Sequence, residues 1–282
     1  MYSELDARRL GGFDVSYVMD ILHCHDIDND LSLKSQLAMR ELDEYPYILV
    51  MPMGNRDLDE IISKEFDSSD IQTTKLYISK IAKCLAHVHS QGYIHGDLKP
   101  KNVMRVNGKL ILIDMDGSAL LQQGYSGTKV SSAYFPPELI YLDRDTNQYK
   151  VKVYSGKTEC DLEEDSKDDT CYGLDSYVSS KYESLETNIK DSSNLVKKYD
   201  YVLTDPAHDI WSFGVLIYFL CTGQSFFFGD KAENIIDQDS LKSLYDFDID
   251  FKAKRLSVVT DSYAKNLISQ LINKDPTKRL SL

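Results

Sequence analysis

Residues 95–114 contain side chains whose types and spacing could carry out phosphoryl transfer. An aspartate, a lysine and an asparagine stand at short offsets, and an apolar run then ends in a second aspartate. Asp97 can accept the proton of an attacking hydroxyl, and Lys99 can neutralise phosphate charge beside it. Asn102 and Asp114 offer oxygen atoms, the ligands that Mg²⁺ prefers. The segment therefore predicts a site where a metal-bound phosphate meets a hydroxyl.

Two flanking elements are expected to position these residues. Residues 109–113 are rich in strand formers, which places Asp114 at the end of a strand. Residues 71–91 repeat apolar side chains at helical spacing, so a helix should precede the segment. Asp, Asn, Lys and Gly are also ordinary turn residues, and a solvated loop is the alternative. The complete ordered set is far less expected by chance than any one of them, and we favour the functional interpretation.

Composition excludes several classes of function. The 282-residue chain is 42% hydrophobic with a formal net charge of −13, which argues against nucleic acid or an anionic membrane as the main partner. The longest apolar run, residues 210–222, is shorter than the about 20 residues that span a bilayer, and indicates a buried helix instead. Five cysteines form no Cys-x-x-Cys pair. We expect a cytoplasmic protein without membrane insertion, and its oligomeric state is unknown from sequence.

The segment resembles the catalytic loop and metal-binding strand of eukaryotic protein kinases, whose pattern is His-Arg-Asp, then Asn, then Asp-Phe-Gly. Two departures stand out. Gly96 replaces the arginine, and Asp116 falls where the family has glycine. The His-Gly-Asp opening with a later Ile-Asp also resembles aminoglycoside and choline phosphotransferases, which share the kinase-like fold.

Three further segments favour protein kinases over these small-molecule enzymes. Residues 131–138 resemble the end of the activation segment, residues 209–214 the start of the central helix, and residues 274–279 a late turn. In the family, the arginine of that turn pairs with the glutamate that closes the activation segment. The resemblance covers residues 4–282 and implies a buried ion pair between Glu138 and Arg279.

The implied fold is α+β and protein-kinase-like, with a mainly helical large lobe and a partial sheet in the small lobe. Residues 1–54 would form the partial small lobe and hinge, and residues 55–282 the large lobe. Strands are expected at residues 18–22 and 45–51. Residues 156–196 are acidic and predict a solvated, largely disordered insertion, and its flanks, 149–154 and 199–203, could pair as a hairpin stem.

The resemblance also assigns the nucleotide site. Met51 would be the gatekeeper residue behind the adenine pocket, and the hinge residues that follow, Pro52, Met53 and Gly54, would bind ATP through their backbone. A plain strand-to-helix loop is the alternative for these four residues.

The small-lobe half of the phosphate site is not evident in the sequence. The family's glycine-rich loop and strand lysine have no convincing counterpart. Residues 4–10 predict the tail of the regulatory helix, stopped by Gly11 and Gly12, with Glu4 as its glutamate and without an evident partner. Lys34 is the other candidate lysine and is expected on a surface loop. We therefore expect residues 1–282 alone to have little or no activity and at best weak nucleotide binding.

The function implied is ATP- and Mg²⁺-dependent phosphorylation of serine or threonine in protein substrates. Lys99 favours this specificity over tyrosine, and Ser131 stands where the family's threonine supports the catalytic aspartate. Gly96 cannot bind an activation-segment phosphate, so activity should not depend on phosphorylation there. A pseudokinase-like module that binds proteins is one alternative, and a small-molecule phosphotransferase is another.

Overall fold

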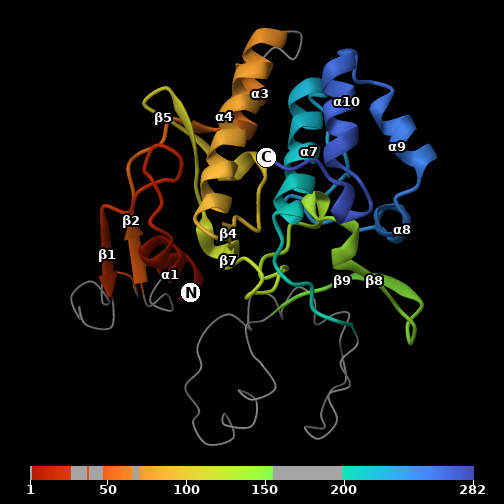
Figure 1. Ribbon diagram of the computed structural model, residues 1–282, viewed down its shortest axis with the longest axis horizontal. Coiled ribbons are helices and arrows are strands. Elements are labelled where there is room, and N and C mark those ends of the chain that lie inside the picture. Colours follow the sequence, from red (N-terminus) through yellow and green to blue (C-terminus); the bar gives the residue numbers. More distant parts are fainter. Residues whose placement is uncertain (1, 27–36, 38–46, 66–69, 155–198) are drawn as a thin grey trace, which may run out of the picture. The chain divides into compact units, whose positions relative to one another are not determined.

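The structure, a computed structural model, describes residues 2–26, 37, 47–65, 70–154 and 199–282 (Figure 1). The chain forms two compact units, one of residues 1–19, 53–155 and 199–282, the other of residues 20–52 and 156–198. The boundary between Pro52 and Met53 falls inside the predicted hinge. The predicted lobe limits, 1–54 and 55–282, stay a prediction. The predicted acidic insertion and Lys34 lie outside the described residues.

The smaller unit contains an antiparallel strand pair, β1 (His23–Asp26) and β2 (Tyr47–Val50). Strand β2 confirms the described part of the strand predicted at residues 45–51. The strand predicted at residues 18–22 is wrong, because Val18 makes only an isolated bridge to Leu112 and β1 begins at His23. The Asp20 carboxylate accepts a hydrogen bond from the Ile21 N–H (2.8 Å), and such local bonds compete with strand pairing.

The larger unit is mainly helical, in agreement with the predicted α+β, kinase-like fold. Its helices are α1 (Tyr2–Gly11), α3 (Leu58–Lys64), α4 (Ile71–Ser90), α7 (Pro206–Thr222), α8 (Gln238–Asp246), α9 (Ile249–Leu256) and α10 (Ser262–Leu271). Helix α7 runs between α4 and α10 (Figure 1). Helix α4 begins where the Asp70 carboxylate caps the N–H groups of Gln72 and Thr73. Among the described residues, no helix has the length and apolar character needed to cross a bilayer.

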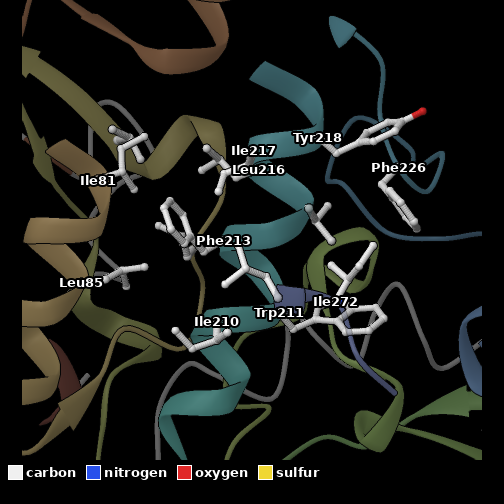
Figure 2. Close-up of a cluster of buried hydrophobic side chains, with 14 of the residues drawn as sticks. Ile81, Leu85, Ile210, Trp211, Phe213, Leu216, Ile217, Tyr218, Phe226 and Ile272 are labelled. Atoms are coloured by element: carbon white, nitrogen blue, oxygen red, sulfur yellow. The ribbon is translucent and has the colours of Figure 1, made fainter. Parts of the chain in front are cut away.

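The core forms around α7, which is buried on nearly every side. Trp211 and Phe213 of α7 are almost completely buried, and Ile81 and Leu85 present the predicted apolar face of α4 to the same cluster (Figure 2). An aspartate before α7 caps its first turn, and Gly223 in a left-handed conformation ends it. The central helix expected from residues 210–222 is therefore confirmed, and it forms a rigid support for the loops at its N-terminus.

Short antiparallel strands complete the larger unit. They are β3 (Arg56–Asp57), β5 (Val103–Val106) and β6 (Lys109–Leu112) in one sheet, β4 (Tyr93–Ile94) with β7 (Ala119–Leu120), and β8 (Ile140–Asp143) with β9 (Gln148–Val151). Strand β6 confirms the predicted strand ahead of Asp114. Single 3-10 turns are η1 (Pro100–Asn102), η2 (Met115–Gly117), η3 (Ser132–Tyr134), η4 (Pro137–Leu139) and η6 (Pro276–Lys278).

The hairpin stem predicted between residues 149–154 and 199–203 is wrong. Strand β9 pairs with β8, which precedes it by a short turn, so the closing loop is much smaller than the one to residue 199. The two flanks are joined by a side chain instead. The Tyr199 hydroxyl accepts from the Val153 N–H (3.0 Å) and donates to the Val153 carbonyl (2.9 Å).

Candidate active site

A buried carboxylate fixes the loop that precedes Asp97. Asp209, in the first turn of α7, has no exposed surface. Its oxygens accept hydrogen bonds from the backbone N–H groups of His95 (2.7 Å) and Gly96 (3.0 Å), and its Oδ2 lies 2.8 Å from Nε2 of His89. Burial opposes ionisation of Asp209, yet the hydrogen bond and charge of His89 hold its pKa well below the usual range. The loop backbone is thereby tied to the central helix.

The glycine that replaces the family's arginine has a steric cause. Gly96 has φ of 78°, and a Cβ there would clash with the carbonyl oxygen of Gly117. A Cβ on Gly117 would in turn crowd Asp97 at 3.2 Å. The catalytic loop and the turn after Asp114 therefore approach backbone to backbone, and only glycine fits at position 96.

His95 is buried and hydrogen-bonded, as expected for a packed loop residue. Its Nε2 lies 3.0 Å from the Ile113 carbonyl, and its Nδ1 accepts from the Asp97 N–H at 3.3 Å. The ring thus links the start of the loop to the end of β6.

Asp97, Lys99, Asn102 and Ser131 lie together in one hydrogen-bonded cluster. Lys99 Nζ is 3.0 Å from Asp97 Oδ2 and 2.7 Å from the Ser131 hydroxyl. Asn102 Nδ2 donates to the Asp97 backbone carbonyl (2.9 Å) and to its Oδ2 (3.1 Å). Asp97 is 5% exposed, and among the described residues its Oδ1 has no hydrogen-bond partner. One buried carboxylate oxygen therefore remains free to accept a proton.

Glu233 extends this cluster. Its carboxylate lies 3.4 Å from Lys99 Nζ and 3.3 Å from Lys101 Nζ. Burial opposes the charge on Lys99, but Asp97 and Glu233 raise the pKa of Lys99 above its usual value. Glu233 has φ of 65°, a conformation that costs energy for a residue with a Cβ. Lys99 is therefore held charged between two carboxylates.

A second acidic group follows β6. Asp114 immediately precedes η2 and has φ of 61°, and Asp116 lies within that turn. Burial, and then the hydrogen bond and charge of Asp114, raise the pKa of Asp116 to about 6, although Lys129 acts in the opposite direction. Lys129, from the activation segment, forms an ion pair with Asp116.

These oxygen donors fit a divalent cation. Asn102 donates its Nδ2 to Asp97, so its amide oxygen Oδ1 is the atom that could bind metal. The nearby Asp114 carboxyl opposes ionisation of Asp116, and a bound cation would relieve this repulsion. Within the described part of the chain, no group of three His, Cys, Asp or Glu side chains has the geometry of a metal site. The candidate set is thus two carboxyls and an amide oxygen.

The four predicted hinge residues divide between the two units. Met51 and Pro52 belong to the smaller unit, and Met53 and Gly54 to the larger one. Met53 is 92% exposed, and a Cβ on Gly54 would clash with the side chain of Met104. Their contact with adenine stays a prediction.

The predicted ion pair between Glu138 and Arg279 is confirmed. Both terminal nitrogens of Arg279 donate to the Glu138 carboxylate at 2.7 Å, and the Arg279 side chain is 1% exposed. The guanidinium also lies over the ring of Trp211 at 5.2 Å. The end of the activation segment is thereby fixed to the helical core.

Helix α1 confirms the predicted helix that ends near Gly11 and packs against η2. Glu4 has a partner other than the lysine with which the family's glutamate pairs. Its carboxylate lies 2.8 Å from Arg8, one turn along the helix, a spacing that favours ion pairs. The role of Glu4 as the regulatory glutamate stays a prediction.

Sequence reasoning missed three side chains of the site. The sequence indicated Asp209 only as the start of a helix. In the structure it accepts hydrogen bonds from His95 and Gly96, which lie 114 and 113 positions earlier in the chain. Glu233 and Lys129 stand in segments without a recognisable pattern. An ionisable residue at the start of an otherwise apolar helix was the one available signal, and it pointed to Asp209.

Comparisons with known proteins agree with this geometry. The family model described as "Protein kinase domain" matches residues 21–156 and 193–282. The smooth-muscle myosin light chain kinase of Gallus gallus is 23% identical over 244 residues, covering 86% of this chain and 10% of that protein. The serine/threonine-protein kinase OXI1 of Arabidopsis thaliana is 24% identical over 277 residues, covering 95% of this chain and 60% of that protein. The chain thus spans less than two thirds of either relative.

A solved structure shows the same fold. The kinase region of twitchin from C. elegans superposes with a TM-score of 0.52 at 20% identity, covering 83% of this chain and 31% of that one. At this identity the likeness establishes the kinase-like fold alone.

Proposed function

Because this chain belongs to the protein kinase domain family, we propose that it transfers the γ-phosphate of ATP to serine or threonine hydroxyls of proteins. One observation carries the proposal: the buried cluster of Asp97, Lys99, Asn102 and Ser131, in which Asp97 Oδ1 has no partner among the described residues. The names of the two relatives, both kinases, support the same chemistry.

Asp97 is proposed to position the substrate hydroxyl and accept its proton. Its Oδ2 is occupied by Lys99 and Asn102, which leaves Oδ1 as the acceptor. An aspartate held by an amide and an ammonium group keeps one orientation, so the hydroxyl is aligned before transfer.

Lys99 is proposed to neutralise charge on the transferred phosphate. Its ammonium group bridges Asp97 and Ser131, and the Glu233 carboxylate lies 3.4 Å from it. A cation fixed beside the accepting carboxylate lowers the repulsion between that carboxylate and an incoming phosphate.

Mg²⁺ would be held by the Asn102 amide oxygen and the Asp114 carboxylate. When bound, it would neutralise phosphate oxygens and orient the triphosphate. The hinge residues Met51, Pro52, Met53 and Gly54 would bind adenine. In the family, a strand lysine also binds the phosphates. This lysine has no evident counterpart in the sequence.

Transfer of labelled γ-phosphate tests the proposal. The full-length protein should label protein substrates in the presence of Mg²⁺, and acid hydrolysis should release phosphoserine and phosphothreonine. Labelling of tyrosine alone, or of an aminoglycoside or choline but no protein, would contradict it.

The metal assignment has its own test. Asp114→Asn should weaken Mg²⁺-dependent binding of ADP, measured by calorimetry, much more than Asp116→Asn. Asp116 is already paired with Lys129, whereas Asp114 stands two residues after the end of β6 and just ahead of η2. The reverse order would move the principal ligand to Asp116.

A further inference from the structure

Lys129 occupies a position that the family pattern does not explain. It comes from the activation segment, yet its ammonium group pairs with Asp116 in the turn that follows β6. Its side chain is 42% exposed, so solvent reaches part of the side chain while the ammonium group is paired. The residue thus brings a positive charge to the acidic end of the site without being enclosed there.

Two contacts hold this stretch of the activation segment in place. The Thr128 hydroxyl donates to the Gly117 carbonyl (3.3 Å), and the Tyr154 N–H donates to the Gly127 carbonyl (3.1 Å). Gly127 has φ of 92°, and a Cβ there would meet the Lys152 carbonyl oxygen at 2.7 Å. The backbone beside Lys129 is therefore attached to η2 on one side and to the chain after β9 on the other.

The electrostatics at Lys129 favour a charged ammonium group. Burial opposes the charge, but Asp116, Asp114 and Asp97 together raise the pKa of Lys129. The carboxylates of both acidic groups therefore act on this one cation. A triphosphate that approaches the same carboxylates adds further negative charge, and it requires fixed positive charge to bind.

We propose that Lys129 is a second phosphate-binding cation of this site, acting on the γ-phosphate beside Lys99, in a chain where the family's strand lysine has no evident counterpart. The inference rests on the proposed function. Asp116 holds the ammonium group at the edge of the site in the absence of nucleotide. On binding, the γ-phosphate of ATP accepts charge-assisted hydrogen bonds from the ammonium group, and Asp116 keeps it oriented.

The opposite role has the same geometry: Lys129 could block the acidic pair and inhibit the enzyme. The two roles differ in the direction of the effect when the charge is removed. A phosphate-binding lysine lowers the dissociation constant for ATP, whereas a blocking lysine raises it.

The test compares binding of MgATP and MgADP to the full-length protein by calorimetry. Lys129→Met should weaken MgATP binding about tenfold or more and MgADP binding less, because a charge-assisted hydrogen bond to the γ-phosphate is lost. Lys129→Arg should retain the preference for ATP. Lys242→Met is the matched control: Lys242 also forms an ion pair, with Asp246 on the exposed side of α8, and this variant should bind both nucleotides as the wild type does.

The outcomes separate this inference from the proposed function. If the wild type binds neither nucleotide and transfers no phosphate, the site itself is refuted and Lys129 with it. If the wild type binds and transfers but Lys129→Met keeps the same ATP preference, the Lys129 role alone is overturned. Tighter binding or faster transfer by Lys129→Met also overturns it, in favour of inhibition. Should the methionine variant lack a cooperative melting transition, Lys129→Gln gives the same comparison.

Discussion

The catalytic loop and the activation segment are held in place by different kinds of interaction. The loop depends on one buried carboxylate, Asp209, which binds two backbone N–H groups and a histidine. The activation segment is held mainly through backbone hydrogen bonds, including Ser126 N–H to the Val202 carbonyl (2.8 Å) and Thr204 N–H to the Gly124 carbonyl (3.0 Å). The first anchor is a single point, and the second is distributed along the chain.

Tyrosine rings reinforce the distributed anchor. Tyr125, Tyr154 and Tyr201 contact one another with ring centroids 4.9–5.3 Å apart. Gly96 has no side chain with which to bind an activation-segment phosphate. The comparison shows that the catalytic loop is fixed through one side chain, whereas this part of the activation segment is fixed by contacts spread over neighbouring chain segments. Outside the Glu138–Arg279 pair that closes the activation segment, single substitutions should therefore be severe at the first anchor and mild at the second.

Loss of Asp209 should have the largest effect on stability. Asp209→Ala leaves the N–H groups of His95 and Gly96 buried without an acceptor, at a cost of about 3–5 kcal/mol in unfolding free energy. Asp205→Ala, on the same helix, removes one capping bond and should cost about 1 kcal/mol. Denaturant unfolding measures both. Equal effects of the two substitutions would mean that Asp209 does not anchor the loop.

Arg279→Ala should rank next, at about 3 kcal/mol, because it leaves Glu138 without its bidentate partner. The Glu138 side chain is 23% exposed, so water can solvate its carboxylate in part, which reduces the loss of unfolding free energy. Lys278→Ala is the control, since its ion pair with Asp275 is at the surface and should contribute little. Thermal melting that is unchanged in Arg279→Ala would refute a structural role for the pair.

Alanine substitutions at two glycines can distinguish the cost of backbone strain from the cost of steric overlap. Gly96 and Gly92 both have positive φ, 78° and 82°, but a Cβ meets the Gly117 carbonyl at Gly96 and nothing within 4 Å at Gly92. In both alanine variants, the left-handed backbone conformation should lower the free energy of unfolding by about 1–2 kcal/mol. Gly96→Ala should cost about 1–3 kcal/mol more than Gly92→Ala in chemical denaturation, because the clash adds to the strain. A smaller penalty at Gly96 would contradict the close approach.

The distributed anchor should tolerate loss of one contact. Tyr199→Phe removes the hydroxyl that bonds both backbone groups of Val153, and should cost about 1 kcal/mol of unfolding free energy. Tyr263→Phe, at a ring that is 81% exposed, should change nothing measurable. A loss at Tyr199 as large as that at Asp209 would show that the activation segment also depends on a single point.

The elements of the fold differ in how far the sequence could predict them. Helix α4 follows from its apolar periodicity, helix α7 from its long apolar run, strand β6 from its strand-forming residues, and the Glu138–Arg279 pair from the family resemblance. The pairing of β9 with β8 was missed because several alternating stretches compete for the same partner. Positions 18–22 were assigned to a strand because apolar content alone does not register the local bond at Asp20.

The site could be predicted only in its local part. Asp97, Lys99 and Asn102 stand within six residues of one another, so their proximity follows from spacing, although their catalytic roles stay a prediction. Asp209 and Lys129 reach the site from distant segments, and no spacing rule connects them with it. Long-range contacts of this kind depend on how helix α7 and the activation segment pack, which a single sequence does not specify.

The most direct test of the account is the rate of phosphate transfer by Asp97→Asn in the full-length protein. Asparagine keeps the size of the side chain and removes the acceptor charge. The turnover number should fall about 10²–10⁴-fold, while the melting temperature and the dissociation constant for MgATP stay close to wild type. Asp250→Asn, at an exposed position in the first turn of α9, should retain full activity. Transfer by Asp97→Asn at the wild-type rate would contradict the assignment of this cluster as the phosphoryl-transfer site.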